Sequence, residues 1–418
     1  MPFSKLGLAP SVCSSLKGLG YTQPTPVQSA SIPLVLGGGD LLARAQTGTG
    51  KTAAFGLPMI DRLMARRRPS SNRRPFGLVL VPTRELAVQV QRALATYGTP
   101  VRLRVTAIFG GAPMPTQIRA LKHGTDIVVA TPGRLIDHLQ RRTVDLSAIE
   151  ILTLDEADRM LDMGFLPALR RVLPVLPQSR QTLMFSATLT DAVAKLAAEF
   201  TRDPARVDVV QGDPVAATIA HRIHPVDLDR KRDLLVHVLT ETRNKEQALV
   251  FCKTKRGADR VGEHLKRAGV DTAVIHGDKG QGARTRSLAD FKAGRVNVLV
   301  ATDIAARGLD IVQLPLVVNY DLPLVPEDYI HRVGRTGRAG AAGRAVSLVT
   351  SSDRQLLRGI QQLLSAPLEQ VAVAGFETAG KFESAGSARP STARRRPRWA
   401  SARTRPASPR GFHQMSAR

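Results

Sequence analysis

The sequence predicts an α/β fold made of two tandem domains, each with a parallel β-sheet covered by helices. Short apolar runs alternate with amphipathic stretches along most of the chain, which is typical of parallel α/β architecture. Two strand-and-turn segments also recur: the segment ending at Thr83 resembles that ending at Thr254, and the segment ending at Thr131 resembles that ending at Thr302. Both pairs of threonines are 171 residues apart (254 − 83 and 302 − 131). One shared spacing favours two similar domains over a chance likeness of buried strands.

The domain limits follow from length and from chain-breaking residues. At roughly 100–200 residues per domain, 418 residues allow two to four domains. Asp-Pro and Gly-Asp-Pro interrupt the pattern between the two repeats. We therefore expect an N-terminal domain over 1–205, a linker over 206–220, a C-terminal domain over 221–375 and a tail over 376–418.

The charge is strongly basic and unevenly distributed. The chain carries 60 Lys and Arg against 35 Asp and Glu, a formal net charge of +25. This excess indicates a polyanionic partner, either nucleic acid or an anionic membrane surface, and an extracellular basic protein is the alternative. Residues 380–418 hold ten basic residues and one acidic residue, a net of +9, without periodic apolar positions. We expect this tail to be disordered and to contact phosphates non-specifically, as does a second basic cluster at Arg66–Arg68 and Arg73–Arg74.

The cysteine content and the lengths of the apolar runs indicate the cellular compartment. Two cysteines, Cys13 and Cys252, exclude a disulfide framework and favour a reducing compartment. No apolar run approaches the ~18–20 residues of a membrane span. Residues 1–10 lack the charged and apolar regions of a signal peptide. We expect a cytoplasmic protein without a membrane partner.

A glycine-rich segment follows the apolar run Leu41–Arg44 and precedes a helical stretch. It reads Ala45-Gln46-Thr47-Gly48-Thr49-Gly50-Lys51-Thr52. A strand, a glycine-rich loop and a helix N-terminus together form a cradle for phosphates. Lys51 is expected to reach the β- and γ-phosphates, and Thr52 to bind Mg²⁺. Ala45 stands where the strict phosphate-loop template has glycine.

An acidic cluster, Asp155-Glu156-Ala157-Asp158, ends the apolar run 149–154. A carboxylate at a strand end downstream of a phosphate loop suits an Mg²⁺ ligand, and its neighbour can orient the attacking water. The alternative is an ordinary acidic first turn of a helix, which the helix dipole favours. The phosphate loop upstream favours the metal interpretation.

With these motifs the chain resembles the DEAD-box ATP-dependent RNA helicases of superfamily 2 over about residues 3–376. The acidic cluster spells the family's signature, and Ala45 is the usual first residue of the family's phosphate loop. Phe3, Gly20-Tyr21 and the run Pro24–Gln28 resemble its adenine-reading Q motif, although phenylalanine is commoner than Tyr21. The run His276–Arg284, with the basic tail, is similar to the bacterial RhlE-like branch.

This resemblance implies two RecA-like domains with ATP bound between them. It assigns nucleotide binding to Phe3, Tyr21, Gln28, Ala45, Gln46, Thr47, Gly48, Thr49, Gly50, Lys51, Thr52 and Asp310. It assigns Mg²⁺ to Thr52 and Asp155, and catalysis to Lys51, Asp155, Glu156, Arg335 and Arg338, with the two arginines acting as arginine fingers. It assigns coupling between the ATP site and RNA to Asp158, Ser186, Thr188 and His331.

RNA is the partner that the resemblance implies, held mainly through phosphates and 2′-hydroxyls. An aromatic content of 4% fits the absence of a base-stacking platform. Ribosomal or RNA-decay proteins are possible further partners in the family, and the sequence does not select among them. The RNA-contacting positions are Pro82, Thr83, Arg84, Gly110, Gly111, Thr131, Pro132, Gly133, Arg134, Thr254, Gln281, Arg284, Thr302 and Arg307.

The expected activity is RNA-stimulated ATP hydrolysis coupled to local unwinding of short RNA duplexes or to remodelling of RNA–protein complexes. Two other classes stay open. A non-catalytic RNA clamp is disfavoured by intact Lys51, Glu156 and Arg335. A DNA helicase is disfavoured by the DEAD signature and Gln28. His331 has no neighbouring His or Cys in sequence, so a metal site there is not expected.

Overall fold

The computed structural model describes residues 2–46, 48–64, 74–209, 219–241, 246–306, 309, 311, 313–337, 343–364 and 368–378. The predicted disordered tail beyond residue 378 and most of the second basic cluster, from 66 to 73, lie outside the described residues. So do four predicted site residues, Thr47, Arg307, Asp310 and Arg338.

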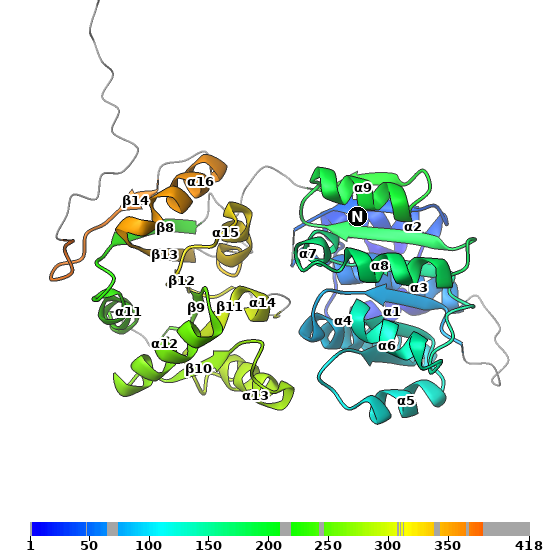
Figure 1. The fold of residues 1–418 in the computed structure, drawn as a ribbon. Helices are drawn as coiled ribbons and strands as arrows, with labels where there is room; N and C mark the ends of the chain where they lie inside the picture. Colours follow the sequence, from blue (N-terminus) through cyan, green and yellow to red (C-terminus); the bar gives the residue numbers. More distant parts are fainter. Residues whose placement is uncertain are drawn as a thin grey trace, which may run out of the picture. The chain divides into compact units, whose positions relative to one another are not determined.

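The first sheet has seven strands, all paired in parallel, in the order β3-β4-β2-β5-β6-β1-β7 (Figure 1). Several strands are buried on both faces, as expected for apolar runs within a parallel sheet. The strands are β1 (Leu41–Arg44), β2 (Gly77–Leu80), β3 (Val105–Ile108), β4 (Ile127–Ala130), β5 (Ile151–Leu154), β6 (Gln181–Ser186) and β7 (Ala205–Asp208).

Helices cover both faces of this sheet. Alternate strand residues point to opposite faces, so Ala43 and Val79 join one apolar core while Leu42 and Leu80 join the other. Figure 1 shows α7, α8 and α9 together on one face. The helices are α1 (Pro10–Gly18), α2 (Pro26–Leu36), α3 (Lys51–Met64), α4 (Arg84–Tyr97), α5 (Met114–Lys122), α6 (Pro132–Gln140), α7 (Ala157–Asp162), α8 (Leu166–Val172) and α9 (Asp191–Phe200), with 3₁₀ turns η1 (Phe3–Leu6), η2 (Thr99–Val101) and η3 (Leu173–Val175).

The second sheet also has seven parallel strands, in the order β10-β11-β9-β12-β13-β8-β14. Its strands are β8 (Ile219–Pro225), β9 (Ala248–Cys252), β10 (Thr272–Ile275), β11 (Val298–Thr302), β12 (Leu316–Asn319), β13 (Gly343–Val349) and β14 (Glu369–Gln370). Its helices are α11 (Lys231–Thr240), α12 (Lys255–Arg267), α13 (Gln281–Lys292), α14 (Asp303–Ala306), α15 (Pro326–Val333) and α16 (Arg354–Leu364), with the 3₁₀ turn η4 (Ser351–Asp353).

The two sheets have the same topology. Counted from its own first strand, each runs 3-4-2-5-6-1-7. The strands before Thr83 and Thr254 are β2 and β9, and those before Thr131 and Thr302 are β4 and β11, so both pairs occupy equivalent positions. The internal repeat and the prediction of two RecA-like domains with parallel sheets are confirmed.

Both sheets extend into the predicted linker over 206–220. β7 continues to Asp208 because it pairs with β1 of the first sheet, and β8 already begins at Ile219. Within the described ranges, no helix combines the length and the apolar character that a membrane span requires. Because all strands of a sheet are parallel, the loops after β1, β2, β4, β5 and β6 emerge at one edge.

Candidate functional site

The predicted phosphate loop connects β1 to α3. Gly48 and Gly50 adopt φ values of +86° and +92°, a left-handed conformation that favours glycine. The Ala45 N–H donates to the Ser186 carbonyl over 2.9 Å, and the Thr49 hydroxyl donates to the Gln46 carbonyl over 2.8 Å. These contacts fold the loop around the N-terminus of α3, where free N–H groups and the helix dipole attract an anion.

Gln28 fastens this loop to α2. Its Nε2 donates to the Gly50 carbonyl over 3.1 Å, while its Oε1 accepts from the Thr25 N–H over 3.0 Å in a capping box. A Cβ on Gly50 would lie 2.3 Å from Nε2 of Gln28, so this approach also requires glycine. Gln28 was predicted to read adenine; the sequence did not reveal that it also fixes the phosphate loop.

Lys51 and Asp155 are buried without the partners that charged groups normally need. Only 6% and 3% of these residues is exposed, and Nζ of Lys51 and Oδ1 of Asp155 have no hydrogen-bond partner among the described residues. Burial raises the pKa of Asp155 to about 6, against the opposing charge of Lys51. Because buried polar atoms without hydrogen-bond partners are costly, these two atoms fit a site that takes a charged ligand. Oxygens of Thr52 and Asp155 are the donor type that Mg²⁺ prefers.

Glu156 follows β5 in a left-handed conformation, with φ of +56°, immediately before α7. Strained backbone at a non-glycine residue is characteristic of functional sites. Its side chain is buried, and its Oε2 lies 3.0 Å from Nη1 of Arg159. Burial alone would raise the pKa of Glu156, but the charges of Arg159, Lys51 and Arg335 lower it below its ordinary value. Glu156 is therefore an ionised carboxylate beside Lys51.

Arg159 is a site residue that the sequence reasoning missed. The only signal was its i+3 spacing from Glu156, which places the two side chains on one side of a helical turn. The ion pair is almost fully buried, with 3% and 4% of the side chains exposed.

Asp158 ties α7 to the loop after β6. Its Oδ2 accepts hydrogen bonds from the N–H groups of Ala187 and Thr188, both over 3.0 Å, and from the Thr188 hydroxyl over 3.2 Å. Burial would raise the pKa of Asp158, but Lys51, His331 and Arg159 lower it. The structure thus brings together Asp158 and Thr188, two of the four predicted coupling residues.

Each of the other two coupling residues has a buried polar atom without a hydrogen-bond partner among the described residues. Ser186 ends β6; its hydroxyl is buried without a hydrogen-bond partner in the described part of the chain. His331 lies on α15, with Nδ1 3.8 Å from Oδ1 of Asp328.

The predicted adenine-side aromatics lie together. The rings of Phe3 and Tyr21 meet edge to face at 6.4 Å, and the Tyr21 hydroxyl lies 2.9 Å from that of Tyr97. Phe3 and Tyr21 line a pocket of about 360 Å³.

Three loops of the first sheet converge, after β2, β3 and β4. The Arg84 guanidinium packs on the glycine pair: a Cβ on Gly111 would lie 2.1 Å from Nη1, and Gly111 has φ of +82°. Arg134 donates from Nη1 to the Ala112 carbonyl over 3.0 Å, and its Nε lies 3.4 Å from Oδ2 of Asp137 in an ion pair. The predicted RNA residues Thr83 and Thr131 stand at the N-caps of α4 and α6 with Pro82, Pro132 and Gly133 beside them.

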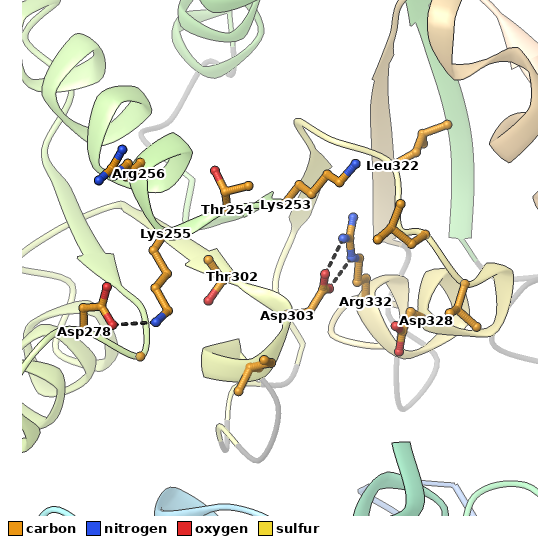
Figure 2. Close-up of a pocket in the computed structure, with 14 residues that line it drawn as sticks. Lys253, Thr254, Lys255, Arg256, Asp278, Thr302, Asp303, Leu322, Asp328 and Arg332 are labelled. Atoms are coloured by element: carbon orange, nitrogen blue, oxygen red, sulfur yellow. Dashed lines mark hydrogen bonds and ion pairs between the residues drawn. The ribbon is translucent and has the colours of Figure 1, made fainter. Parts of the chain in front are cut away.

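A pocket of about 720 Å³ opens at the equivalent edge of the second sheet. Figure 2 shows Thr254 and Thr302 on its lining, between the Lys255–Asp278 ion pair and the Arg332–Asp303 ion pair. Thr254 caps α12 by accepting from the Gly257 N–H over 3.0 Å, as Thr83 caps α4 by accepting from the Leu86 N–H over 3.3 Å. Thr254 and Thr302, two of the predicted RNA residues of this domain, thus line one pocket.

Gln281 and Arg284, also predicted to contact RNA, are engaged with Glu85 of α4. Nη2 of Arg284 lies 2.8 Å from Oε1 of Glu85, and Nε2 of Gln281 donates to the same oxygen over 3.2 Å. The Arg284 and Glu85 side chains are only 8% and 9% exposed. Their direct contact with RNA stays a prediction.

Arg332 and Arg335 lie three residues apart, at the C-terminal end of α15 and just after it, and both are buried. Arg335 donates from Nη1 to the Leu309 carbonyl over 2.7 Å. Arg332 forms a two-pronged ion pair with Asp303, at 2.6 and 2.7 Å, and donates to Asn319 and to the Asp321 carbonyl. No role was predicted for Arg332, and its contacts are those of a clamp between α14, β12 and α15.

Replacing Arg332 with methionine is expected to lower the free energy of unfolding by about 3–5 kcal/mol, because it leaves the Asp303 carboxylate and nearby carbonyls without their partner. Urea unfolding of the full chain measures this. The matched control is Arg344→Met, which breaks an exposed pair with Glu246 and should cost about 1 kcal/mol or less. Equal losses in the two variants would contradict the clamp.

Similarity to known proteins identifies the family to which this chain belongs. Residues 25–196 match the family model of the DEAD/DEAH box helicases, and residues 230–340 match that of the helicase conserved C-terminal domain. The chain belongs to the DEAD-box helicase family.

Two relatives illustrate the match. The ATP-dependent RNA helicase DeaD of Escherichia coli K12 is 42% identical over 380 residues, covering 91% of this chain and 60% of that protein. The DEAD-box ATP-dependent RNA helicase CshA of Bacillus cereus is 41% identical over 369 residues, covering 88% and 69%. The chain thus spans about 60% of the length of DeaD. The finer assignment to the RhlE-like branch stays a prediction.

Solved structures agree in fold. Dbp5 of S. cerevisiae, bound to RNA and ADP BeF3, matches with a TM-score of 0.78 and 31% identity, over 89% of this chain and 95% of that one. A Dbp5 variant bound to Gle1 and IP6 matches with a TM-score of 0.71.

Proposed function

We propose that this protein is an ATP-dependent RNA helicase that couples RNA-stimulated ATP hydrolysis to local opening of short RNA duplexes or to remodelling of RNA–protein complexes. The observation that carries the proposal is the buried cluster of Lys51, Asp155 and Glu156, in which Lys51 Nζ and Asp155 Oδ1 have no hydrogen-bond partner among the described residues. The relatives named as RNA helicases, and Dbp5 bound to RNA, support the choice of substrate.

In this proposal the phosphates of ATP lie at the N-terminus of α3, with Lys51 on the β- and γ-phosphates. Mg²⁺, held by Thr52 and Asp155, would supply charge neutralisation on the phosphates. Glu156 is ionised and positions or deprotonates the attacking water. Phe3, Tyr21 and Gln28 bind adenine, and Asp310 binds the ribose. Arg335 and Arg338 stabilise the transition-state charge.

RNA binds at the carboxyl edges of both sheets in this proposal. Arg84, Arg134 and the Gly110–Gly111 loop contact phosphates from the first domain, and Thr254 and Thr302 from the second. RNA held by both domains favours the state in which Arg335 completes the ATP site, because a ligand shifts an equilibrium only through its differential affinity. Asp158 carries this change to Ala187 and Thr188 through three hydrogen bonds. A cytoplasmic location and ribosomal or RNA-decay partners are expectations of the family resemblance.

The test is phosphate release from Mg-ATP with and without RNA, together with strand separation of a short RNA duplex and a DNA duplex of equal sequence. We expect RNA to raise turnover and only the RNA duplex to be opened. Unchanged turnover on RNA addition would leave an RNA clamp as the better description. Preferential opening of the DNA duplex would show that DNA, and not RNA, is the substrate.

A further inference from the structure

The loop that carries Gly110 and Gly111 is held from behind by Gln117. This residue lies on α5 and is only 6% exposed. Its Oε1 accepts from the Phe109 N–H over 3.2 Å, and its Nε2 donates to the carbonyls of Phe109 and Ala112 over 3.1 and 3.3 Å. One side-chain amide thus satisfies three backbone groups on both sides of the glycine pair.

His138 lies behind this amide on α6 and is fully buried. Its Nε2 is 3.4 Å from Oε1 of Gln117, and its Nδ1 is 2.8 Å from the Thr143 hydroxyl. Oε1 of Gln117 accepts from the Phe109 N–H, so the contact at Nε2 of His138 is a hydrogen bond when Nε2 carries the proton. The Thr143 hydroxyl then donates to Nδ1 in place of the His138 carbonyl, which lies 3.1 Å from it. Burial and the charge of Arg134 lower the pKa of His138, which favours this neutral ring.

Arg84 and Arg134 both contact the Gly110–Gly111 loop that Gln117 holds. Arg84 packs on Gly111 so closely that a Cβ there would lie 2.1 Å from its guanidinium, and Arg134 donates to the Ala112 carbonyl. Gly111 requires a left-handed backbone, with φ of +82°, which an unsupported loop would populate only part of the time. Loss of Gln117 therefore releases the loop and, with it, the placement of both guanidinium groups.

We propose that Gln117, supported by His138, is a positioning residue for RNA binding: it fixes the Gly110–Gly111 loop so that Arg84 and Arg134 present their charges to RNA phosphates. This inference rests on the proposed function of those arginines. It concerns RNA affinity alone. Gln117 contacts the loop after β3, and His138 contacts Gln117 and Thr143, which follows α6. Among the described residues, these hydrogen bonds do not involve the phosphate loop or Glu156.

The experiment measures the RNA concentration that gives half-maximal stimulation of ATP turnover by the full chain. Gln117→Leu keeps the size of the side chain and removes its hydrogen bonds. We expect the half-saturating RNA concentration to rise about tenfold, since polar backbone groups lose their partners. Basal turnover and the KM for ATP should stay at the parent values.

Variants of His138 test whether this residue supports Gln117. His138→Leu should raise the half-saturating RNA concentration in the same direction, and His138→Gln should restore it, because a glutamine amide can donate from the place of Nε2. The matched control is Gln140→Leu, the same substitution at an exposed residue of α6, which should have no effect.

The outcomes separate this inference from the proposed function. If RNA fails to stimulate the parent protein, the proposed function itself is wrong. If the parent is stimulated and Gln117→Leu has the parent's half-saturating RNA concentration, the positioning role is wrong. A parallel loss of basal turnover would make Gln117 a merely structural residue and overturn the inference. Should Gln117→Leu fail to fold, equal RNA requirements of His138→Leu and His138→Gln would overturn it.

Discussion

Replacing Glu156 with glutamine is expected to lower RNA-stimulated ATP turnover by about 10²–10⁴-fold, the range that a lost general base accounts for. Glutamine has the shape of glutamate and can still accept a hydrogen bond from Arg159, but it cannot take a proton from water. The left-handed backbone at this position is unaffected. Binding of ATP and RNA should persist, because Lys51 and the RNA-side loops are unchanged. Single-turnover phosphate release, with nucleotide and RNA binding measured alongside, checks this result.

The buried ion pair with Arg159 calls for a control. In Glu156→Gln the guanidinium keeps its charge without a counter-charge, and this could disturb the site by itself. The double variant Glu156→Gln with Arg159→Met removes that charge. Turnover that returns in the double variant would show that the unpaired arginine caused the loss. Normal turnover in the single variant would remove Glu156 from its proposed role.

Much of the fold could be predicted because short stretches of sequence indicate its strands, turns and glycine-rich loop. The strands before Thr83 and Thr254 are short apolar runs followed by the same turn chemistry, and their spacing revealed the repeat before any contact was known. The phosphate loop is also local: glycines, Lys51 and Thr52 stand in one run between a strand and a helix. Such features need no long-range information.

The contacts that the sequence did not reveal are those made across the chain. Gln28 reaches Gly50, 22 residues away, and Arg332 reaches Asp303, 29 residues away. The residues next to Gly50 and Asp303 in sequence do not indicate these contacts, because the parallel sheets bring the loops together only after folding. The end of β7 was missed for the same reason: residues 206–208 lack a strong strand pattern and are held by pairing with β1.

Arg335→Ala is the second change with a large expected effect, a fall in RNA-stimulated turnover of about 10³–10⁵-fold, the value of an arginine finger. Affinity for ATP and RNA should change little, because the guanidinium acts on charge that develops during the reaction. Arg335 is 3% exposed and donates to the Leu309 carbonyl, and both features restrict its side chain. Arg335→Lys keeps the charge and loses the planar fork, so it should not restore turnover.

Arg332 supplies an internal comparison three residues away. Both arginines are buried, but Arg332 donates to Asp303, Asn319 and the Asp321 carbonyl, whereas Arg335 donates from Nη1 to the Leu309 carbonyl. We expect loss of Arg332, with its ion pair to Asp303, to appear in urea unfolding. We expect loss of Arg335, in its proposed role at the ATP phosphates, to appear in the rate of phosphate release. If Arg335→Ala lowers stability as much as Arg332→Met and lowers turnover only in proportion to the unfolded fraction, then Arg335 is a structural residue as well. Full turnover in Arg335→Lys would instead mean that positive charge suffices and that the geometry of the guanidinium does not matter.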